Sequence, residues 1–250
     1  MNIRRMIVSL TMVCLCVTST SSAQSDVSSK IETDVVYGHK DGLAMTMDIF
    51  RPEGDANSAA IVFIMSGGWY SRWAPPEKVR PLFQPYLQKG YSVAAVRHGS
   101  SPRYSIPEAV SDVKQAVRFI RQNAKRLRVD ADRLGVMGMS AGGHLALMMG
   151  TTGDDGATAG QGELSSTSSR VAAVVALVPP TDLSIMVWDA PESLPAYRNF
   201  PALELSIEKA KQNSPLLHVT ADDAPSLILV GEKDELVPPK HGQWIAEAFE

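Results

Sequence analysis

A serine between two glycines is the residue whose surroundings point most clearly to chemistry. Residues 138–142 read GMSAG and match the pattern G-x-S-x-G, with Ser140 at its centre. The strand-like run RLGVMGM leads into this pattern, and the helix-like run AGGHLALMM includes its end. A turn between a strand and a helix exposes the serine hydroxyl and places it at the positive end of the helix dipole. Ser140 is therefore predicted to be a nucleophile that attacks an acyl group and forms an acyl-enzyme.

The glycines of this pattern have a steric reason. Gly138 and Gly142 stand two residues on either side of Ser140. Side chains at these two positions would collide with the neighbouring strand and helix, because the serine occupies a strained turn. We therefore expect the turn to depend on the glycines and not on the serine hydroxyl.

A second pair of glycines ends an earlier apolar run. The sequence IMSGGWY carries Gly67 and Gly68, and glycine lets the backbone turn its N–H groups toward a reacting oxygen. We predict an oxyanion hole formed by the backbone N–H groups of Gly68, Trp69 and Ala141. The side chains of Trp69 and Tyr70 are predicted to form walls of the substrate pocket.

Apolar runs and amphipathic segments alternate from Ile61 onward. Buried strands are predicted in the runs SAAIVFIMSGG, YSVAAVRH, ADRLGVMGM, VAAVVALVPP and APSLILVG. Helices are predicted in EKVRPLFQPYLQKG, in SIPEAVSDVKQAVRFIRQNAKRL, after Ser140, and in PPKHGQWIAEAFE. Buried runs joined by helical crossovers imply an α/β protein with a mostly parallel sheet and helices on both faces.

Three segments fall outside this alternation. The runs TDVVYG and LAMTMDIFRP predict an antiparallel N-terminal hairpin around the turn HKDG. Residues 151–169 are rich in Gly, Ser, Thr and Asp and predict a mobile surface loop without chemistry. Residues 186–206 carry Trp188, Tyr197 and Phe200 among prolines, which suits either a small cap or an ordinary long connection. Trp188 is predicted to line the substrate pocket.

Composition restricts the class of partner. The chain has 250 residues, of which 44% are hydrophobic and 20% are charged, and its formal net charge is -3. This length and composition predict one globular domain with a substantial core. Lys and Arg form no long block, so we expect no nucleic-acid partner and no attraction to an anionic membrane.

The first 23 residues predict export. A basic start, the apolar run MIVSLTMVCLCV and the small residues before Gln24 are typical of a signal peptide that is cleaved after Ala23. The apolar run is too short to span a bilayer, so we expect no stable membrane association after cleavage. Both cysteines, Cys14 and Cys16, fall inside the removed segment. The predicted mature domain, residues 24–250, is secreted or periplasmic.

The longer motifs resemble a known superfamily. The segments SGGWYSRW, GVMGMSAGGHLA, VPPTDL and NSPLLHVTADDAPSLILVGEKDELVPP resemble the α/β-hydrolases, in the same order along the chain. They are similar to the branch of hormone-sensitive-lipase-like and feruloyl or acetylxylan esterase-like enzymes (BD-FAE-like), which is related to the prolyl oligopeptidases. One departure is Ser66, because the family usually has histidine before the two glycines.

The resemblance implies a serine esterase. Asp234 would be the acid that orients the catalytic histidine, and Glu232, Asp222 and Asp223 are its rivals. The implied substrate is an acylated carbohydrate or a small carboxylic ester, and no metal or other cofactor is implied. A prolyl-oligopeptidase-like peptidase and a catalytically incomplete hydrolase-fold protein remain as alternatives.

The histidine base is the missing member of this set. In the family the histidine follows the acid by one helix and one strand, which needs roughly 25 residues. Only 16 residues follow Asp234, and His241 is the sole histidine among them. His241 falls in the first turns of a predicted helix, so we expect the base beyond Glu250 and a domain truncated at its C-terminus. Ordinary structural roles are expected for the other histidines, with His144 bracing the serine turn: His39, His98, His144 and His218.

Overall fold

The computed structural model describes residues 29–52, 54–156 and 164–250. The predicted signal peptide, residues 1–23, lies outside the described residues. So does residue 53, and so do residues 157–163 of the predicted surface loop.

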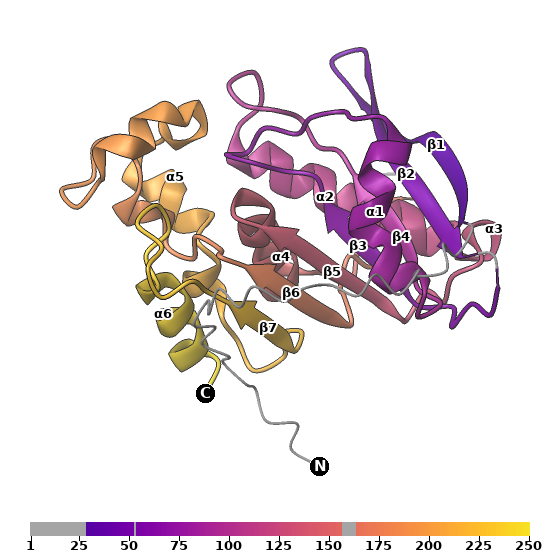
Figure 1. Cartoon of the computed structure of the whole chain (residues 1–250). Coiled ribbons are helices and arrows are strands. Elements are labelled where there is room, and N and C mark those ends of the chain that lie inside the picture. Colours follow the sequence, from indigo (N-terminus) through magenta and orange to yellow (C-terminus); the bar gives the residue numbers. More distant parts are fainter. Residues whose placement is uncertain (1–28, 53, 157–163) are drawn as a thin grey trace, which may run out of the picture.

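A mixed sheet, with seven strands among the described residues, forms the centre of the fold (Figure 1). The strand order is β1-β2-β4-β3-β5-β6-β7, and all neighbours from β4 to β7 are parallel. The hairpin β1-β2 is antiparallel, and β2 also pairs with β4 in the antiparallel direction. The predicted hairpin and mostly parallel sheet are both confirmed. The strands are β1 (Ser29–Lys40), β2 (Leu43–Pro52), β3 (Ala60–Ile64), β4 (Ser92–Val96), β5 (Leu134–Met139), β6 (Ala173–Leu177) and β7 (Ser226–Leu229).

Helices cover both faces of the sheet. All five residues of β4 are buried, which is expected for a parallel strand enclosed on both sides. Val93 and Ala95 pack with Phe83 and Leu87 of α1 in one cluster, whereas the alternate strand residues belong to the larger core beneath α2 and α4. The helices are α1 (Pro76–Leu87), α2 (Ile106–Gln122), α3 (Ala124–Leu127), α4 (Ala141–Thr152), α5 (Ile207–Gln212) and α6 (Lys240–Ala248).

The long helix predicted to run through to Leu127 is interrupted. Its start agrees with the prediction, because Ser105 and Glu108 form a capping box at the beginning of α2. Asn123 then leaves helical geometry with φ -99° and ψ 16°, and its side-chain N–H group donates to Phe119 O at 2.9 Å. An asparagine side chain that bonds to the backbone competes with helix continuation, so α3 is a separate short helix.

A small cap follows β6. Four short 3-10 helices and α5 lie between β6 and β7 and project beyond the sheet, shown in orange in Figure 1. Met186, Tyr197, Phe200 and Leu203 of this segment line one cavity with Ser140, so the cap interpretation of residues 186–206 is confirmed. The 3-10 helices are η1 (Leu183–Ile185), η2 (Pro195–Asn199), η3 (Pro201–Leu203) and η4 (Pro215–His218).

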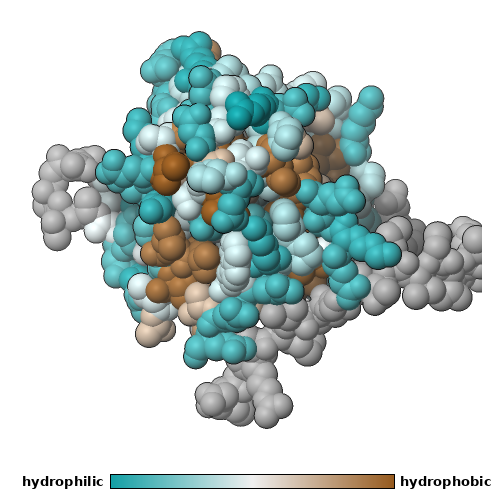
Figure 2. Space-filling view, turned by 90° about the vertical axis from the view of Figure 1, so that its left-hand side faces the viewer, coloured by the Kyte–Doolittle hydropathy of each residue, from teal (hydrophilic) through white to brown (hydrophobic). Residues whose placement is uncertain are grey.

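The surface on the cap side is mainly hydrophilic, with separate hydrophobic groups between polar ones (Figure 2). Exposed apolar side chains of these C-terminal elements are Ile207, Leu217, Leu227 and Leu236. None of the helices in the described part of the chain is both long and apolar enough to span a bilayer.

Candidate active site

Ser140 occupies a sharp turn between β5 and α4. Its backbone has φ 53° and ψ -120°, a conformation that is strained for a residue with a side chain. The Ser140 N–H group donates to Leu177 O at 2.8 Å, and Ser140 O accepts from the His144 N–H group at 2.9 Å. These bonds fix the backbone, while the half-buried hydroxyl makes no hydrogen bond to a described residue. The hydroxyl is therefore positioned and unengaged.

Close contacts explain the glycines around Ser140. A Cβ atom on Gly138 would lie 2.2 Å from Gly142 O, and one on Gly142 would lie 2.9 Å from Ile64 O of β3. Real Cβ atoms do not approach backbone atoms so closely. The predicted collisions with the helix on one side and the strand on the other are confirmed.

The segment after β3 faces the same site. Gly68 and Trp69 both have φ 57°, and Gly67 forms two 3.0 Å backbone hydrogen bonds with Tyr70 across this turn. No described residue accepts a hydrogen bond from the N–H groups of Gly68, Trp69 or Ala141. Free N–H groups beside a nucleophile are what an oxyanion hole requires. Residues 66–71 are called the oxyanion segment below.

Ser66 stands where the resembling family usually has histidine. Ser66 Oγ is buried and has no hydrogen-bond partner among the described residues. The backbone donors that follow it do not depend on its side chain, so the substitution leaves the proposed oxyanion groups in place.

A small cavity joins these groups. Its volume is about 20 Å³, and residues of the cap form part of its lining while the cavity stays partly open. Phe200 presses on the oxyanion segment, because a Cβ atom on Gly68 would lie 2.6 Å from its ring. Sequence reasoning placed Phe200 in the cap but did not assign it to the site. The lining residues are Gly68, Trp69, Ser140, Pro180, Met186, Tyr197, Phe200, Leu203, Leu236 and Val237.

Two aromatic residues predicted for the pocket lie elsewhere. Tyr70 lines a separate, larger pocket on the other side of the oxyanion segment. Trp188 packs against the core, and its indole N–H group donates to Tyr197 O at 3.2 Å. Of the three predicted wall residues, only Trp69 lines the cavity at Ser140.

Asp234 lies in the turn after β7. Its Oδ1 atom accepts from the N–H groups of Leu236 at 2.9 Å and Val237 at 2.8 Å, which leaves Oδ2 without a hydrogen bond in the described structure. Leu236 and Val237 both line the cavity of Ser140, so the turn of Asp234 borders the site. Burial raises the pKa of the Tyr197 hydroxyl, and the charge of Asp234 raises it further.

Two of the three rival carboxylates lie on the other side of β7 in the chain. Asp222 and Asp223 precede β7 and accept hydrogen bonds from Thr220. Hydrogen bonds from Thr220 and Arg170 lower the pKa of Asp222. In a parallel sheet this end of β7 is opposite to the end that carries Asp234. Among the described residues no group of three His, Cys, Asp or Glu side chains could hold a metal ion.

Comparison with known proteins identifies the family. The BD-FAE family profile matches residues 47–249. This chain belongs to the BD-FAE family. Its fold is that of the α/β-hydrolases: a solved truncated carbohydrate esterase from gut microbiota has a TM-score of 0.75 at 28% identity, covering 90% of this chain and 85% of that one. Thermogutta terrifontis esterase 2 phosphonylated by sarin gives a TM-score of 0.70 at 27% identity, covering 88% and 79%.

Curated relatives of this BD-FAE chain carry esterase names. The probable carboxylic ester hydrolase LipM of Mycobacterium tuberculosis is 28% identical over 82% of this chain and 48% of its own length. Esterase LipQ of the same organism is 26% identical over 87% and 52%. An ethyl acetate hydrolase of Pseudomonas putida is 28% identical over 86% and 68%. The chain thus spans about half the length of the Mycobacterium tuberculosis relatives.

His144 links the oxyanion segment to the end of α5 in this BD-FAE chain. Its Nδ1 atom accepts from the Trp69 indole N–H group at 3.1 Å, and its Nε2–H group donates to Asn213 O at 2.6 Å. Burial lowers the pKa of the His144 imidazole to about 4, so the ring is neutral at pH 7. Both ring nitrogens are occupied, which gives His144 the bracing role that its sequence position predicts.

His241 is fully buried in the first turn of α6. Its Nδ1 atom accepts from the N–H groups of Thr181 at 3.2 Å and Asp182 at 3.4 Å, and burial lowers its pKa to about 4. The proton therefore sits on Nε2, which has no partner among the described residues. No imidazole nitrogen of the five histidines hydrogen bonds to Ser140 or Asp234 within the described structure.

Proposed function

We propose that this chain carries the nucleophile, the oxyanion groups and the acid of a serine esterase. The observation that carries the proposal is the meeting of the unengaged Ser140 hydroxyl and free backbone N–H groups at one cavity. The esterase names of the relatives support the same activity. In this scheme Asp234 is the acid, since its turn borders that cavity.

The proposed reaction proceeds through an acyl-enzyme. Ser140 Oγ attacks the ester carbonyl carbon and loses its proton to a histidine base. The N–H groups of Gly68, Trp69 and Ala141 stabilise the negative oxygen, and the alcohol leaves with a proton. Water then hydrolyses the acyl-enzyme and releases the acid. The histidine base stays a prediction, with Asp234 orienting it.

The cavity at Ser140 favours a short acyl group. A volume of about 20 Å³ holds little more than one water molecule. An acetyl group fits this space with small side-chain adjustments, whereas a proline-containing acyl group would require the cap to move. We therefore propose an acetylated carbohydrate or another small carboxylic ester as the substrate. The predicted signal peptide would place the enzyme outside the cytoplasm.

Hydrolysis of p-nitrophenyl acetate tests this function, with a proline-containing p-nitroanilide as the peptidase control. Ester turnover that is lost in Ser140→Ala is expected, together with covalent labelling of Ser140 by a fluorophosphonate. Faster cleavage of the anilide would favour the peptidase. No labelling and no turnover of either substrate would identify a catalytically incomplete hydrolase-fold protein.

A further inference from the structure

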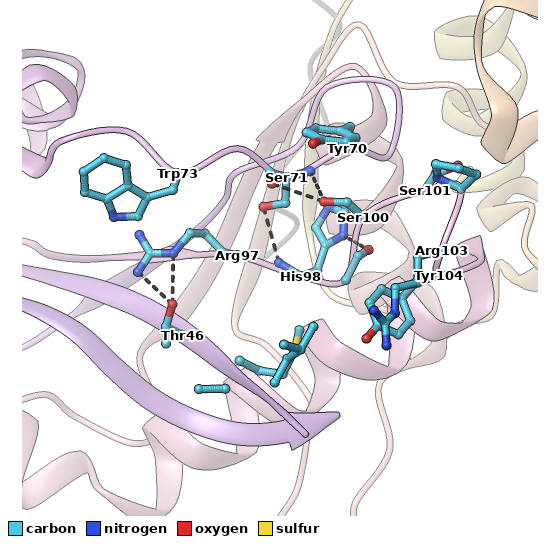
Figure 3. Close-up of a pocket in the computed structure, with 15 residues that line it drawn as sticks. Thr46, Tyr70, Ser71, Trp73, Arg97, His98, Ser100, Ser101, Arg103 and Tyr104 are labelled. Atoms are coloured by element: carbon cyan, nitrogen blue, oxygen red, sulfur yellow. Dashed lines mark hydrogen bonds between the residues drawn. The ribbon is translucent and has the colours of Figure 1, made fainter. Parts of the chain in front are cut away.

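A second and much larger pocket lies on the other side of the oxyanion segment. Its volume is about 490 Å³, within the range of pockets that bind small molecules. Figure 3 shows Tyr70 and Trp73 above it, Arg97 and His98 from the segment just after β4, and Tyr104 just before α2. None of these five residues takes part in the proposed ester cleavage.

The pocket is tied to the oxyanion segment. Trp69 O accepts from the Ser101 N–H group at 3.1 Å, and the Ser71 N–H group donates to Ser100 Oγ at 2.9 Å. Ser71, Ser100 and Ser101 all line the pocket. A ligand here would therefore touch the same short segment that supplies the N–H groups facing Ser140.

The charges around the pocket are balanced. Arg97 forms ion pairs with Asp48 and Asp34, and also donates to Thr46 Oγ1. Arg103 lies 3.6 Å from Asp41. With its basic groups already paired, this surface favours a neutral ligand over an anion.

Two buried polar atoms at the pocket lack partners. His98 is 4% exposed, and its Nδ1–H group donates to Gly99 O at 2.8 Å. The neutral ring then leaves Nε2 as a hydrogen-bond acceptor with no described partner. The hydroxyl of Tyr104, which is 6% exposed, is also without a described partner. Such atoms normally find partners, and a ligand hydroxyl could donate to the first and bond to the second.

Aromatic rings stand at the mouth of the pocket. Trp73 is 60% exposed and Tyr70 is 48% exposed, values that are high for large rings in a folded protein. Each ring offers a flat apolar face beside polar groups. Flat apolar faces combined with hydrogen-bonding groups complement a ring that carries hydroxyls on its edge and C–H groups on its faces.

We propose that this pocket binds a neutral pyranose unit of an oligosaccharide, with Trp73 stacking on the sugar ring. Tyr104 and His98 would bond to its hydroxyls after local adjustment of the enclosed side chains. The link to catalysis rests on the proposed esterase function: the sugar would belong to the alcohol part of an acylated oligosaccharide whose ester lies at Ser140. Binding itself does not depend on that function.

Direct titration with unesterified xylotetraose, cellotetraose and mannotetraose tests the binding step. Trp73→Ala is expected to raise the Kd of the best ligand about tenfold, whereas Trp73→Phe changes it less. Leu82→Ala is the control, because Leu82 is 53% exposed on α1 and lies outside the pocket lining. Absence of binding to all three sugars, or equal binding by Trp73→Ala and wild type, would overturn the proposal.

Tyr104→Phe provides an independent test. It removes one unpartnered hydroxyl, so the thermal midpoint should stay the same or rise while the sugar Kd increases several-fold. A variant that binds sugar as wild type does would exclude the hydroxyl contact.

Parallel kinetics separate this inference from the esterase function. Trp73→Ala should hydrolyse p-nitrophenyl acetate like wild type and lose about tenfold in kcat/KM on an acetylated form of the bound sugar. Sugar binding without any ester hydrolysis would remove the esterase proposal and leave the binding site. Ester hydrolysis without sugar binding would overturn the sugar-binding proposal and leave the esterase proposal standing.

Discussion

The two sides of the oxyanion segment differ in almost every physical respect. Toward Ser140 lies a cavity of about 20 Å³ lined mainly by apolar side chains, and on the other side lies a pocket of about 490 Å³ with exposed rings and hydroxyls. Tight packing on the first side holds reacting groups in fixed positions. Open space on the second side suits the recognition of a larger group. One short segment can serve both tasks because Trp69 lines the first cavity and Tyr70 lines the second pocket.

Two buried histidines repeat this contrast. His144, under the first side, has both ring nitrogens bonded, to Trp69 and to Asn213. His98, under the second side, has only one nitrogen bonded, to Gly99. Burial lowers the pKa of both rings. An imidazole with both nitrogens hydrogen bonded braces the fold. An imidazole with one nitrogen unbonded retains a hydrogen-bonding site for a ligand.

The largest effect is expected at the nucleophile. Ser140→Ala should lower ester turnover by at least about 10³-fold, while the free energy of unfolding changes by less than about 1 kcal/mol. The turn is held by its backbone bonds and glycines, so the hydroxyl contributes little to stability. Initial rates on p-nitrophenyl acetate and urea unfolding measure the two quantities. Retained turnover would contradict the role of Ser140 as the nucleophile. Sugar binding by the Ser140→Ala variant should be unchanged.

The second-largest effect is expected at Gly138, the glycine that precedes the serine turn. Gly138→Ala is expected to destabilise the fold by about 2–4 kcal/mol and to lower turnover about 100-fold, because the new Cβ atom meets Gly142 O. Gly67→Ala is the matched control, since a Cβ atom there meets nothing within 4 Å. Urea unfolding and turnover of both variants test this difference. Equal losses in the two variants would contradict the steric explanation.

Local features of the site could be predicted from the sequence. The glycines around Ser140 are explained by contacts within a few residues and with one adjacent strand, so the pattern and elementary sterics were enough. The alternation of apolar runs likewise predicted the sheet and both layers of helices. Asn123 shows the limit of this approach, because a single side-chain bond to the backbone divided a helix with continuous periodicity.

Features that depend on long-range packing could not be predicted. Phe200 reaches Gly68 from a cap more than 100 positions later in the chain, and no local pattern encodes that contact. Tyr70 follows Trp69 directly, yet backbone geometry turns it to the other pocket. Trp188 was predicted from its aromatic character, but its indole bonds within the cap.

The bracing histidine should make stability depend on pH. His144 has a pKa of about 4 in the folded state against 6.5 as its ordinary value, so only the unfolded chain gains its proton between these values. The contribution of His144 to the free energy of unfolding is fully present above pH 6.5. It decreases by up to about 3 kcal/mol as the pH falls to 4. His144→Phe should be less stable at pH 7, because Trp69 and Asn213 lose their partner, and its stability should fall less steeply with pH.

Urea unfolding from pH 7 to pH 4 measures how steeply the free energy of unfolding changes with pH in the wild type and in His144→Phe. His98→Phe is the comparison from the other side of the oxyanion segment, and it should cost less at pH 7 because it removes one hydrogen bond instead of two. An unchanged slope in His144→Phe would show that other groups cause the acid sensitivity.

The smallest effect concerns the choice of acyl group. Phe200→Ala removes the ring that closes the cavity over Gly68, so longer acyl chains gain room beside Ser140. The ratio of kcat/KM for p-nitrophenyl butyrate to that for the acetate should rise about tenfold, since an extra methylene group in an apolar pocket contributes about 1–3 kcal/mol. Tyr70→Ala removes an aromatic ring from the opposite side of the same segment and should leave the ratio unchanged. If both variants alter the ratio equally, acyl selection is not confined to the cavity at Ser140. The choice of acyl group would then depend on the conformation of the whole oxyanion segment. A change confined to Phe200→Ala would locate acyl selection in the cap and leave recognition of the alcohol part to the pocket of Trp73.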